Sequence, residues 1–460
     1  MKTRFVIIAI VILLALSGTG LAVSAWVMRP RLLEVFPLPG AENVSAASPI
    51  RLGFSRSMQT ESVIQHLNIE PPMQGEFSWD KNVLTFLPSH SWPGGQEIRL
   101  SIEAGSRAAS WLTFPMQALS WSFSTSQSYL AYLWPADGPA DMYILSPETG
   151  VVQQLTSGMS VLEYTVSKDG FTIYFSSSNS QGGSDLYIYD RIRAAVTQSY
   201  YKTEILLDCG QAQCRSPAVS LDGTSMAYEY LPFTKSGELN PASIWLLNLA
   251  TLSTSQAGQI GHETVQPAWS SAGLLVYYDR TDSQYEVFNP QNQARLGWPN
   301  QTGQPGAWSP DGNFYLAPEI YYHPSGEQGE TGTSHLLRYP AQQGASEDLS
   351  LEGDVEDVGG VYSPDGTTIA FARKFLDRDH WSLGRQIWVM NADGSVAHPI
   401  TDADDYNHYD LAWSPDSLKI AYVRFNQAKL STPPELWMTN VDGSSPIDLV
   451  IGGYAPEWIP

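Results

Sequence analysis

The chain has 460 residues, of which 43% are hydrophobic and only 16% are charged. This composition argues against a long disordered tail or a coiled coil, and the length is ample for a large buried core. With 25 basic and 47 acidic residues the formal net charge is −22, so the chain repels phosphate backbones and we expect no nucleic-acid partner.

The N-terminus contains an uncharged apolar run at residues 5–27, preceded by Lys2 and Arg4. The run is long enough to cross a bilayer as a helix. Small residues at 23–25 leave the alternative of a cleaved signal peptide open. We therefore expect residues 1–29 to be a signal-anchor or transmembrane segment, with the bulk of a single-pass membrane protein in the periplasm or outside the cell. If the segment is cleaved, the protein is secreted.

Alternation of apolar and polar residues, punctuated by proline and glycine, predicts a small all-β sandwich over residues 30–125. The expected strands are residues 50–54, 83–86, 97–102 and 119–124. The segment Ile50-Arg51-Leu52-Gly53-Phe54-Ser55-Arg56-Ser57-Met58 resembles the opening of bacterial Ig-like domains of the SbsA type, and residues 84–88 and 95–98 resemble its later half. The resemblance implies a spacer or adhesion module near a cell surface, without catalytic residues.

The remaining residues, 126–460, contain an internal repeat. Its anchor is a hydrophobic or aromatic residue followed by serine, any residue, aspartate and glycine. The anchor recurs at steps of 39 to 54 residues, at 166–170, 219–223, 308–312, 362–366 and 413–417, with a degenerate copy at 269–273. A repeat of this length in β-rich sequence is typical of propeller blades.

The two ends of the repeat predict how the propeller closes. Residues 129–132 read as the second strand of a blade, and residues 456–460 read as an anchor without a following strand. We therefore expect the C-terminal strand to complete the first blade, which would leave no free sheet edge. The anchors predict seven blades, or six if the degenerate copy is not a separate blade.

The repeat also resembles a known family. Tyr362-Ser363-Pro364-Asp365-Gly366-Thr367-Thr368-Ile369-Ala370-Phe371 is similar to the W-S-P-D-G-x-x-I-A-F signature of TolB-like propellers with WD40-like (PD40-type) repeats, and residues 386–395 are similar to its second half. TolB is periplasmic and binds protein partners, and related propellers adjoin serine-peptidase domains. The resemblance implies the fold more strongly than any function.

The two cysteines, Cys209 and Cys214, are close in sequence in an exported chain and favour a small-loop disulfide. Two free thiols remain an alternative. A metal site would need further ligands.

Other motifs are better explained by structural roles than by catalysis or ligand binding. The repeated anchor aspartates suit tight turns, and the anchor tryptophans suit packing between blades. There is no G-x-S-x-G and no P-loop, and His262-Glu263 starts like H-E-x-x-H but ends in Gln266. We therefore expect no catalytic, cofactor or metal residues and no enzyme. The acidic stretch 402–410 is either a solvated loop or a Ca²⁺ site.

Long insertions between the second and third strands should emerge on one face, at 234–241, 321–334, 373–385 and 425–434. Arg373, Phe375 and Trp381 form a candidate recognition loop, since rigid scaffolds present binding loops and aromatic and arginine residues often dominate interfaces. We favour a membrane-tethered, non-catalytic binding or scaffold protein for a protein or envelope component. An enzyme acting on an envelope glycan or peptide in the propeller channel and a structural cell-surface component are the alternatives.

Overall fold

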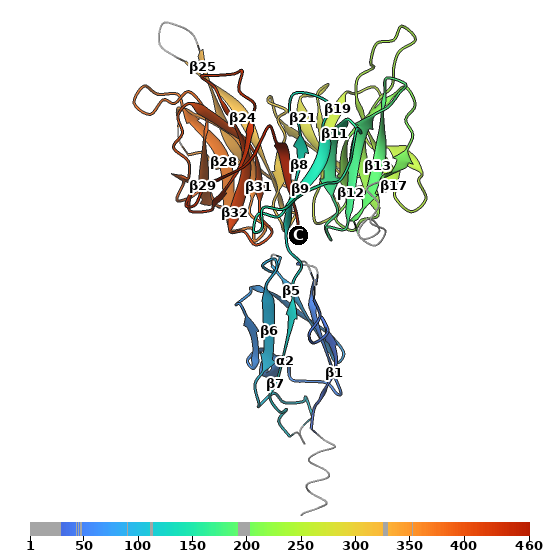
Figure 1. Cartoon of the computed structure of the whole chain (residues 1–460), viewed down its shortest axis with the longest axis vertical. Coiled ribbons are helices and arrows are strands. Elements are labelled where there is room, and N and C mark those ends of the chain that lie inside the picture. The colour runs from blue at the N-terminus through green and yellow to red at the C-terminus, as the bar shows by residue number, and fades with distance from the viewer. Residues whose placement is uncertain are drawn as a thin grey trace, which may run out of the picture. The chain divides into compact units, whose positions relative to one another are not determined.

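The computed structural model describes residues 29–460 except 43, 45, 47, 90, 111–113, 192–202, 325–329 and 352. The expected signal-anchor segment, residues 1–29, lies outside the described residues except for its last residue. Within the described ranges, no helix is long and apolar enough to cross a membrane. The chain divides into two compact units, Met1–Gln127 and Ser128–Pro460, which are treated separately here (Figure 1).

Unit 1 consists of two antiparallel sheets around one core. The sheets have the strand orders β1 (Leu32–Phe36), β2 (Ile50–Phe54), β5 (Val83–Pro88), β4 (Gly75–Asp80) and β3 (Leu67–Glu70), β6 (Glu97–Ile102), β7 (Leu119–Ser124). Inward residues such as Leu52, Phe86 and Phe123 are almost completely buried around Trp92. Alternate burial along these strands is the pattern of a sandwich with one solvated face on each sheet.

The four strands expected in this unit are all present, whereas β1, β3 and β4 were not predicted. Most of the side chains of β4 are exposed or half-exposed, so this edge strand carries little hydrophobic alternation. The short helix α2 (Thr60–Ile64), with Val63 buried, also differs from the expected absence of helices. A helix this short leaves almost no periodic signal in the sequence.

Unit 2 is built from consecutive sets of antiparallel strands. In chain order these are β8 (Tyr129–Trp134), β9 (Asp141–Leu145), β10 (Val152–Gln154); β11 (Val161–Val166), β12 (Thr172–Ser178), β13 (Ser184–Asp190), β14 (Thr203–Leu207); β15 (Gln213–Val219), β16 (Ser225–Leu231), β17 (Ser243–Asn248), β18 (Thr254–Gln256); β19 (Thr264–Trp269), β20 (Leu275–Asp279), β21 (Gln284–Phe288), β22 (Arg295–Pro299); β23 (Ala307–Trp308), β24 (Phe314–Pro324), β25 (Glu330–Pro340), β26 (Glu347–Asp348); β27 (Val355–Tyr362), β28 (Thr368–Phe375), β29 (Gln386–Asn391), β30 (His398–Pro399); and β31 (Tyr406–Trp413), β32 (Lys419–Asn426), β33 (Glu435–Asn440), β34 (Ile447–Ile451). One further strand, β35 (Tyr454–Ile459), follows the last set. Antiparallel meanders of this kind, repeated along one chain, are the strand pattern of a β-propeller.

The C-terminal strand belongs to the sheet of the first strands of unit 2. β35 pairs antiparallel with β8, with Trp458 opposite Leu130 and Ile459 opposite Tyr129. The strand order of that sheet is β10-β9-β8-β35. The expected return of the last strand to the first sheet is therefore present.

The repeated anchors form the turns between the first and second strand of each set. At the best-matched anchor, the Asp365 carboxylate accepts hydrogen bonds from Ser363 Oγ at 2.6 Å and from the Thr367 backbone N–H at 3.0 Å. Gly366 has φ +72°, a conformation that glycine adopts without strain. Asp169, Asp222, Asp311 and Asp416 make the same serine contact. The structural role predicted for these aspartates is confirmed.

The anchor tryptophans join neighbouring sets. Trp269 Nε1 donates to the carbonyl oxygen of Ala218 at 2.9 Å, from β19 to β15. Equivalent bonds run from Trp308 to Ala268, from Trp413 to Val361 and from Trp458 to Ala412, at 3.1 to 3.2 Å. Each indole thus packs its ring between two sheets and satisfies its N–H on the backbone of the preceding set, as expected.

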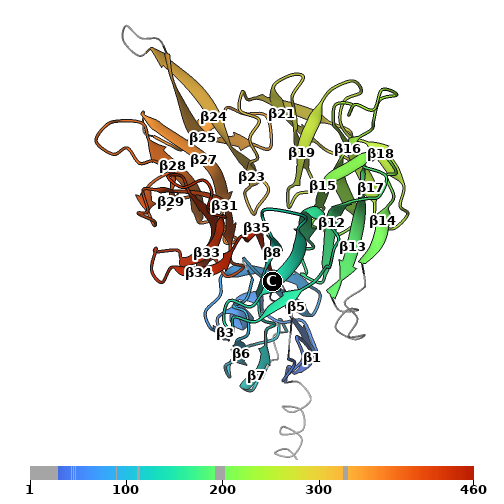
Figure 2. The same ribbon diagram turned by 45° about the horizontal axis from the view of Figure 1, so that its top comes forward.

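One expected insertion is regular instead. Residues 321–324 continue β24 and residues 330–334 begin β25, so that only 325–329 separate two paired strands of 11 residues each. Figures 1 and 2 both show β24 and β25 extending beyond their neighbouring strands. The sequence of this segment, rich in glycine and polar residues, has no apolar alternation that would indicate a pair of strands.

Candidate functional site

The three residues predicted for recognition lie at the end of β28, which contains Arg373 and Phe375, and in the connection to β29, which contains Trp381. The structure assigns them different roles. Arg373, at the base, is only 2% exposed and forms a bidentate ion pair with the fully buried Asp357 of β27, with both N···O distances at 2.7 Å. Its Nη2 also donates to the Ser350 carbonyl oxygen at 3.0 Å. The prediction that Arg373 is exposed for recognition is therefore wrong, because its side chain is buried and holds β28 against β27 at the base of the loop.

Trp381 lies in the exposed part of this loop and contacts both Lys374 and Phe375. Its side chain is 55% exposed, and Lys374 Nζ lies 4.9 Å from its ring centroid in a cation–π contact. Phe375 forms an isolated β-bridge with Trp381 and packs its own ring against Trp388, so it is half-buried. We call Lys374 and Trp381 the aromatic–lysine pair. They form an accessible amphipathic surface on a rigid base, which is the arrangement that interface hot spots favour.

A second candidate region is formed by the first strands of the sets. β15, β19, β27, β31 and β35 each have a register shift next to a residue of positive φ. Such β-bulges leave one backbone N–H without a ladder partner. At β15 the Ser216 N–H donates to Glu163 at 2.7 Å, and at β19 the Gln266 N–H donates to Glu229 at 2.9 Å. Carboxylates from the preceding set thus cap the bulges.

Residues at β11, β15 and β19 border a hollow of about 410 Å³, whose lining includes Tyr164, Lys168, Leu221 and Trp269. Next to it, Glu457 accepts a hydrogen bond from the Val166 N–H at 2.9 Å, and burial raises the pKa of Glu457 to about 7. The region therefore holds a carboxyl group that titrates near neutrality, a property that is more frequent at functional sites than elsewhere.

The sequence did not reveal the bulges or the carboxylates that cap them. One signal in the sequence was a proline two residues before the hydrophobic or aromatic residue that opens the anchor, as at Pro217, Pro267 and Pro456, since proline in a strand is confined to edges and bulges.

The acidic stretch 402–410 is divided between a loop and a strand. Only residues 402–405 form a connection, and β31 begins at Tyr406. His408 is buried, its Nδ1 lies 2.7 Å from the Arg385 carbonyl oxygen, and burial lowers its pKa to about 4. Burial also raises the pKa of Asp410, which receives a hydrogen bond from the Ala455 N–H. In the part of the chain that the structure describes, these groups do not converge on one cation position.

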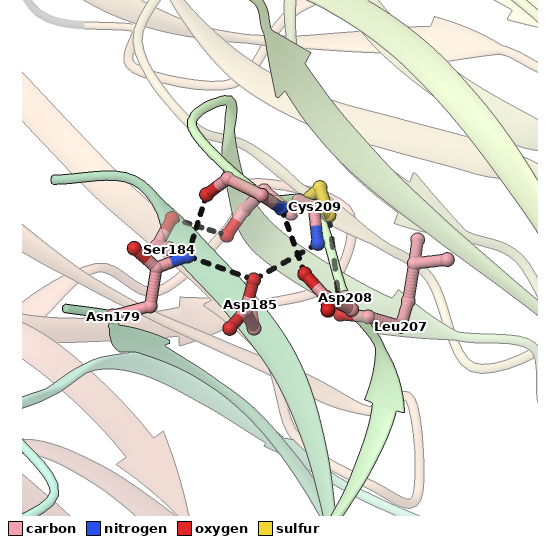
Figure 3. The surroundings of a disulfide bond; sticks show 8 residues. Asn179, Ser184, Asp185, Leu207, Asp208 and Cys209 are labelled. Carbon is pink, nitrogen blue, oxygen red and sulfur yellow. Dashed lines mark hydrogen bonds between the residues drawn. A yellow bond between two sulfur atoms is a disulfide. The ribbon is translucent and has the colours of Figure 1, made fainter. Parts of the chain in front are cut away.

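Cys209 and Cys214 form a disulfide with Cα atoms 6.3 Å apart (Figure 3). The bridge closes the connection from β14 to β15 against the turn before β13. Asp185 accepts a hydrogen bond from the Cys209 N–H at 2.9 Å, and Asn179 Nδ2 donates to the Gly210 carbonyl oxygen at 2.7 Å. Ser184 Oγ donates to the Cys214 carbonyl oxygen at 2.8 Å. The disulfide therefore holds a loop that is also fixed by hydrogen bonds, which points to a structural role.

Replacing both cysteines by serine should lower the free energy of unfolding of unit 2 by about 2 kcal/mol, because the short cross-linked loop gains chain entropy in the unfolded state. Guanidinium denaturation of oxidised wild type, reduced wild type and the double variant would measure this. Reduced wild type and the variant should agree. An unchanged midpoint in both would show that the hydrogen bonds alone hold the loop.

Comparison with known proteins identifies the first unit. Residues 27–125 match the family model described as a bacterial Ig-like domain. No curated protein matches the chain.

Several solved structures resemble the chain at low sequence identity. TolB from Acinetobacter baumannii is 13% identical, with a TM-score of 0.42, and the match covers 86% of this chain and 83% of that one. The β-propeller domain of the Trilobed protease from Pyrococcus furiosus is also 13% identical, with a TM-score of 0.45 and coverage of 63% and 82%. A puromycin-hydrolysing peptidase from Mycobacterium tuberculosis is 10% identical, with a TM-score of 0.50 and coverage of 78% and 52%. The prediction of an N-terminal Ig-like domain is confirmed by the family match. The likeness to the peptidase structure concerns the fold alone.

Proposed function

We propose that this chain is a non-catalytic binding or scaffold protein that recognises a protein or another envelope component with one face of its propeller unit. The observation that carries the proposal is the aromatic–lysine pair, exposed on a loop whose base is fixed by the buried Arg373–Asp357 ion pair. A pre-organised loop loses little conformational entropy on binding, which favours recognition.

We also propose that the propeller has seven blades and is closed by the C-terminal strand. The support is a continuous series of contacts between neighbouring first strands. Trp458 of β35 bonds to β31, and Glu457 of β35 accepts a hydrogen bond from Val166 of β11. The first strands would then surround a central channel, and the connections between second and third strands would share one face.

The proposed location is outside the cytoplasm of a bacterium, with the N-terminal apolar segment as a membrane anchor. The bacterial Ig-like match and the disulfide support this, because disulfides persist in oxidising compartments. The Ig-like unit would serve as a spacer between the membrane and the propeller.

The binding proposal predicts that Trp381→Ala weakens capture of the partner at least tenfold without changing thermal stability, since a hot-spot aromatic contributes about 2 kcal/mol or more. The immobilised full chain would capture proteins from detergent-solubilised envelope of the source bacterium, with identification by mass spectrometry. Leu418→Ala is the matched control, because Leu418 is 57% exposed at an anchor turn, on the opposite edge of the sheets. Equal loss in both variants, or none in either, would contradict the proposal.

The channel hollow supports an enzyme acting on an envelope glycan or peptide as a second candidate. The observation that favours it is the raised pKa of Glu457 beside that hollow. A screen of envelope glycans and peptides against wild type and Glu457→Gln would test it, because a general base must lose activity when its carboxyl becomes an amide.

A further inference from the structure

We propose that His262, Asp279 and Asp282 form a binding site for a divalent transition-metal cation such as Zn²⁺ or Mn²⁺. His262 precedes β19, Asp279 ends β20 and Asp282 lies in the turn to β21, so strand pairing rather than a local motif brings them together. Within the described residues, they are the one set of three histidine, cysteine or acidic side chains whose ligand atoms all lie within 4.8 Å of one another.

The distances between the donor atoms fit one shared ion. His262 Nδ1 lies 2.7 Å from Asp279 Oδ2 and 3.7 Å from Asp282 Oδ2. Ligands about 2.0–2.2 Å from one cation are roughly 2.8–3.1 Å apart in octahedral geometry and roughly 3.3–3.6 Å apart in tetrahedral geometry. The two measured distances lie just outside these ranges on either side, so an ion fits with shifts of a few tenths of an ångström in the half-exposed His262 and the exposed Asp282.

Asp279 supplies a buried carboxylate whose ion-pair partner is His262 of the same cluster. The Asp279 side chain is completely buried, and buried charges are normally paired or bound to a metal. Its Oδ1 already accepts the backbone N–H groups of Thr281 and Asp282, which directs Oδ2 towards His262. In the described part of the chain, no lysine or arginine forms an ion pair with Asp279 or Asp282.

The nearby cations are already paired elsewhere. The guanidinium of Arg280 pairs with Glu263 at 2.6 Å, and that of Arg295 pairs with the buried Glu286. Neither guanidinium therefore forms an ion pair with Asp279 or Asp282. One imidazole nitrogen and two carboxylate oxygens favour Zn²⁺ or Mn²⁺ over Ca²⁺, which prefers six to eight oxygen ligands. Water would complete the coordination on the exposed side.

The test is calorimetric titration of the metal-free full chain with ZnCl₂, MnCl₂ and CaCl₂ in separate runs. We expect one saturable Zn²⁺ or Mn²⁺ site in wild type, with affinity at least tenfold lower in both His262→Gln and Asp282→Asn. These two side chains are half-exposed or exposed, so their replacement should preserve the fold, whereas Asp279 also holds the turn.

His380→Gln is the matched control. His380 also contacts one carboxylate, that of Asp377 at 3.1 Å, but belongs to no set of three ligands within the described ranges. Wild-type affinity in this variant, together with a metal-dependent rise in melting temperature that His262→Gln lacks, would establish the site. Absence of saturable binding, unchanged affinity in His262→Gln, or tighter binding of Ca²⁺ than of both transition metals would overturn the proposal.

Discussion

Replacing Arg373 by methionine should destabilise unit 2 by about 3–5 kcal/mol, the usual result when one partner of a buried ion pair is removed. The variant leaves the carboxylate of Asp357 completely buried without its two guanidinium hydrogen bonds, and the Ser350 carbonyl oxygen also loses a donor. It also removes the cation that lies 5.1 Å from the ring centroids of both Phe371 and Trp388. Guanidinium denaturation, followed by tryptophan fluorescence, would measure the loss.

Two further variants distinguish the contribution of the buried ion pair to stability from that of the exposed side chains next to it. Lys374→Met changes the neighbouring residue, whose ammonium group reaches the exposed Trp381 ring, and should cost less than about 1 kcal/mol. The double variant Arg373→Met with Asp357→Leu removes both buried charges and should recover much of the stability. If Arg373→Met kept wild-type stability and lost only partner binding, Arg373 would be a recognition residue after all.

Arg373 also illustrates what the sequence could and could not predict. The motif resemblance covers residues 362–371 and therefore the start of β28, but the strand continues to Phe375, so Arg373 lies inside a sheet and not in a loop. Its partner is 16 residues away on β27, in register opposite it. Sequence patterns predict which residues form strands, whereas the charge that faces a buried arginine depends on pairing between strands.

The repeated features were predictable for a different reason. Each anchor turn is local, because Asp365 bonds to groups two residues before and after itself, and local hydrogen bonding follows from residue type. The indole N–H of Trp413, in contrast, donates a hydrogen bond to the carbonyl oxygen of Val361, 52 residues away in the sequence. Only the repetition of the motif indicated such a contact between neighbouring sets of strands. The cluster of His262, Asp279 and Asp282 has neither a local motif nor a repeat, so the sequence could not reveal it.

Replacing Glu457 by glutamine should stabilise unit 2 by about 2–3 kcal/mol at pH 8 and by almost nothing near pH 4. The pKa of Glu457 is about 7 in the folded protein, against an ordinary value of 4.5. Between these values the folded state binds a proton that the unfolded state releases, so stability falls as pH rises from about 4.5 to 7 and is level above that. Glutamine cannot ionise, yet its carbonyl oxygen still accepts the Val166 N–H.

The comparison of stability at the two pH values contains its own control, because wild type and variant should converge where the carboxyl group is protonated in both states. Hydrogen exchange would locate the effect: the amides of β35 and β11 should gain protection at pH 8, since Glu457 joins these strands. A constant difference at both pH values would mean that packing, not ionisation, distinguishes the proteins. A less stable variant at pH 8 would show that the charged carboxylate is favourable there.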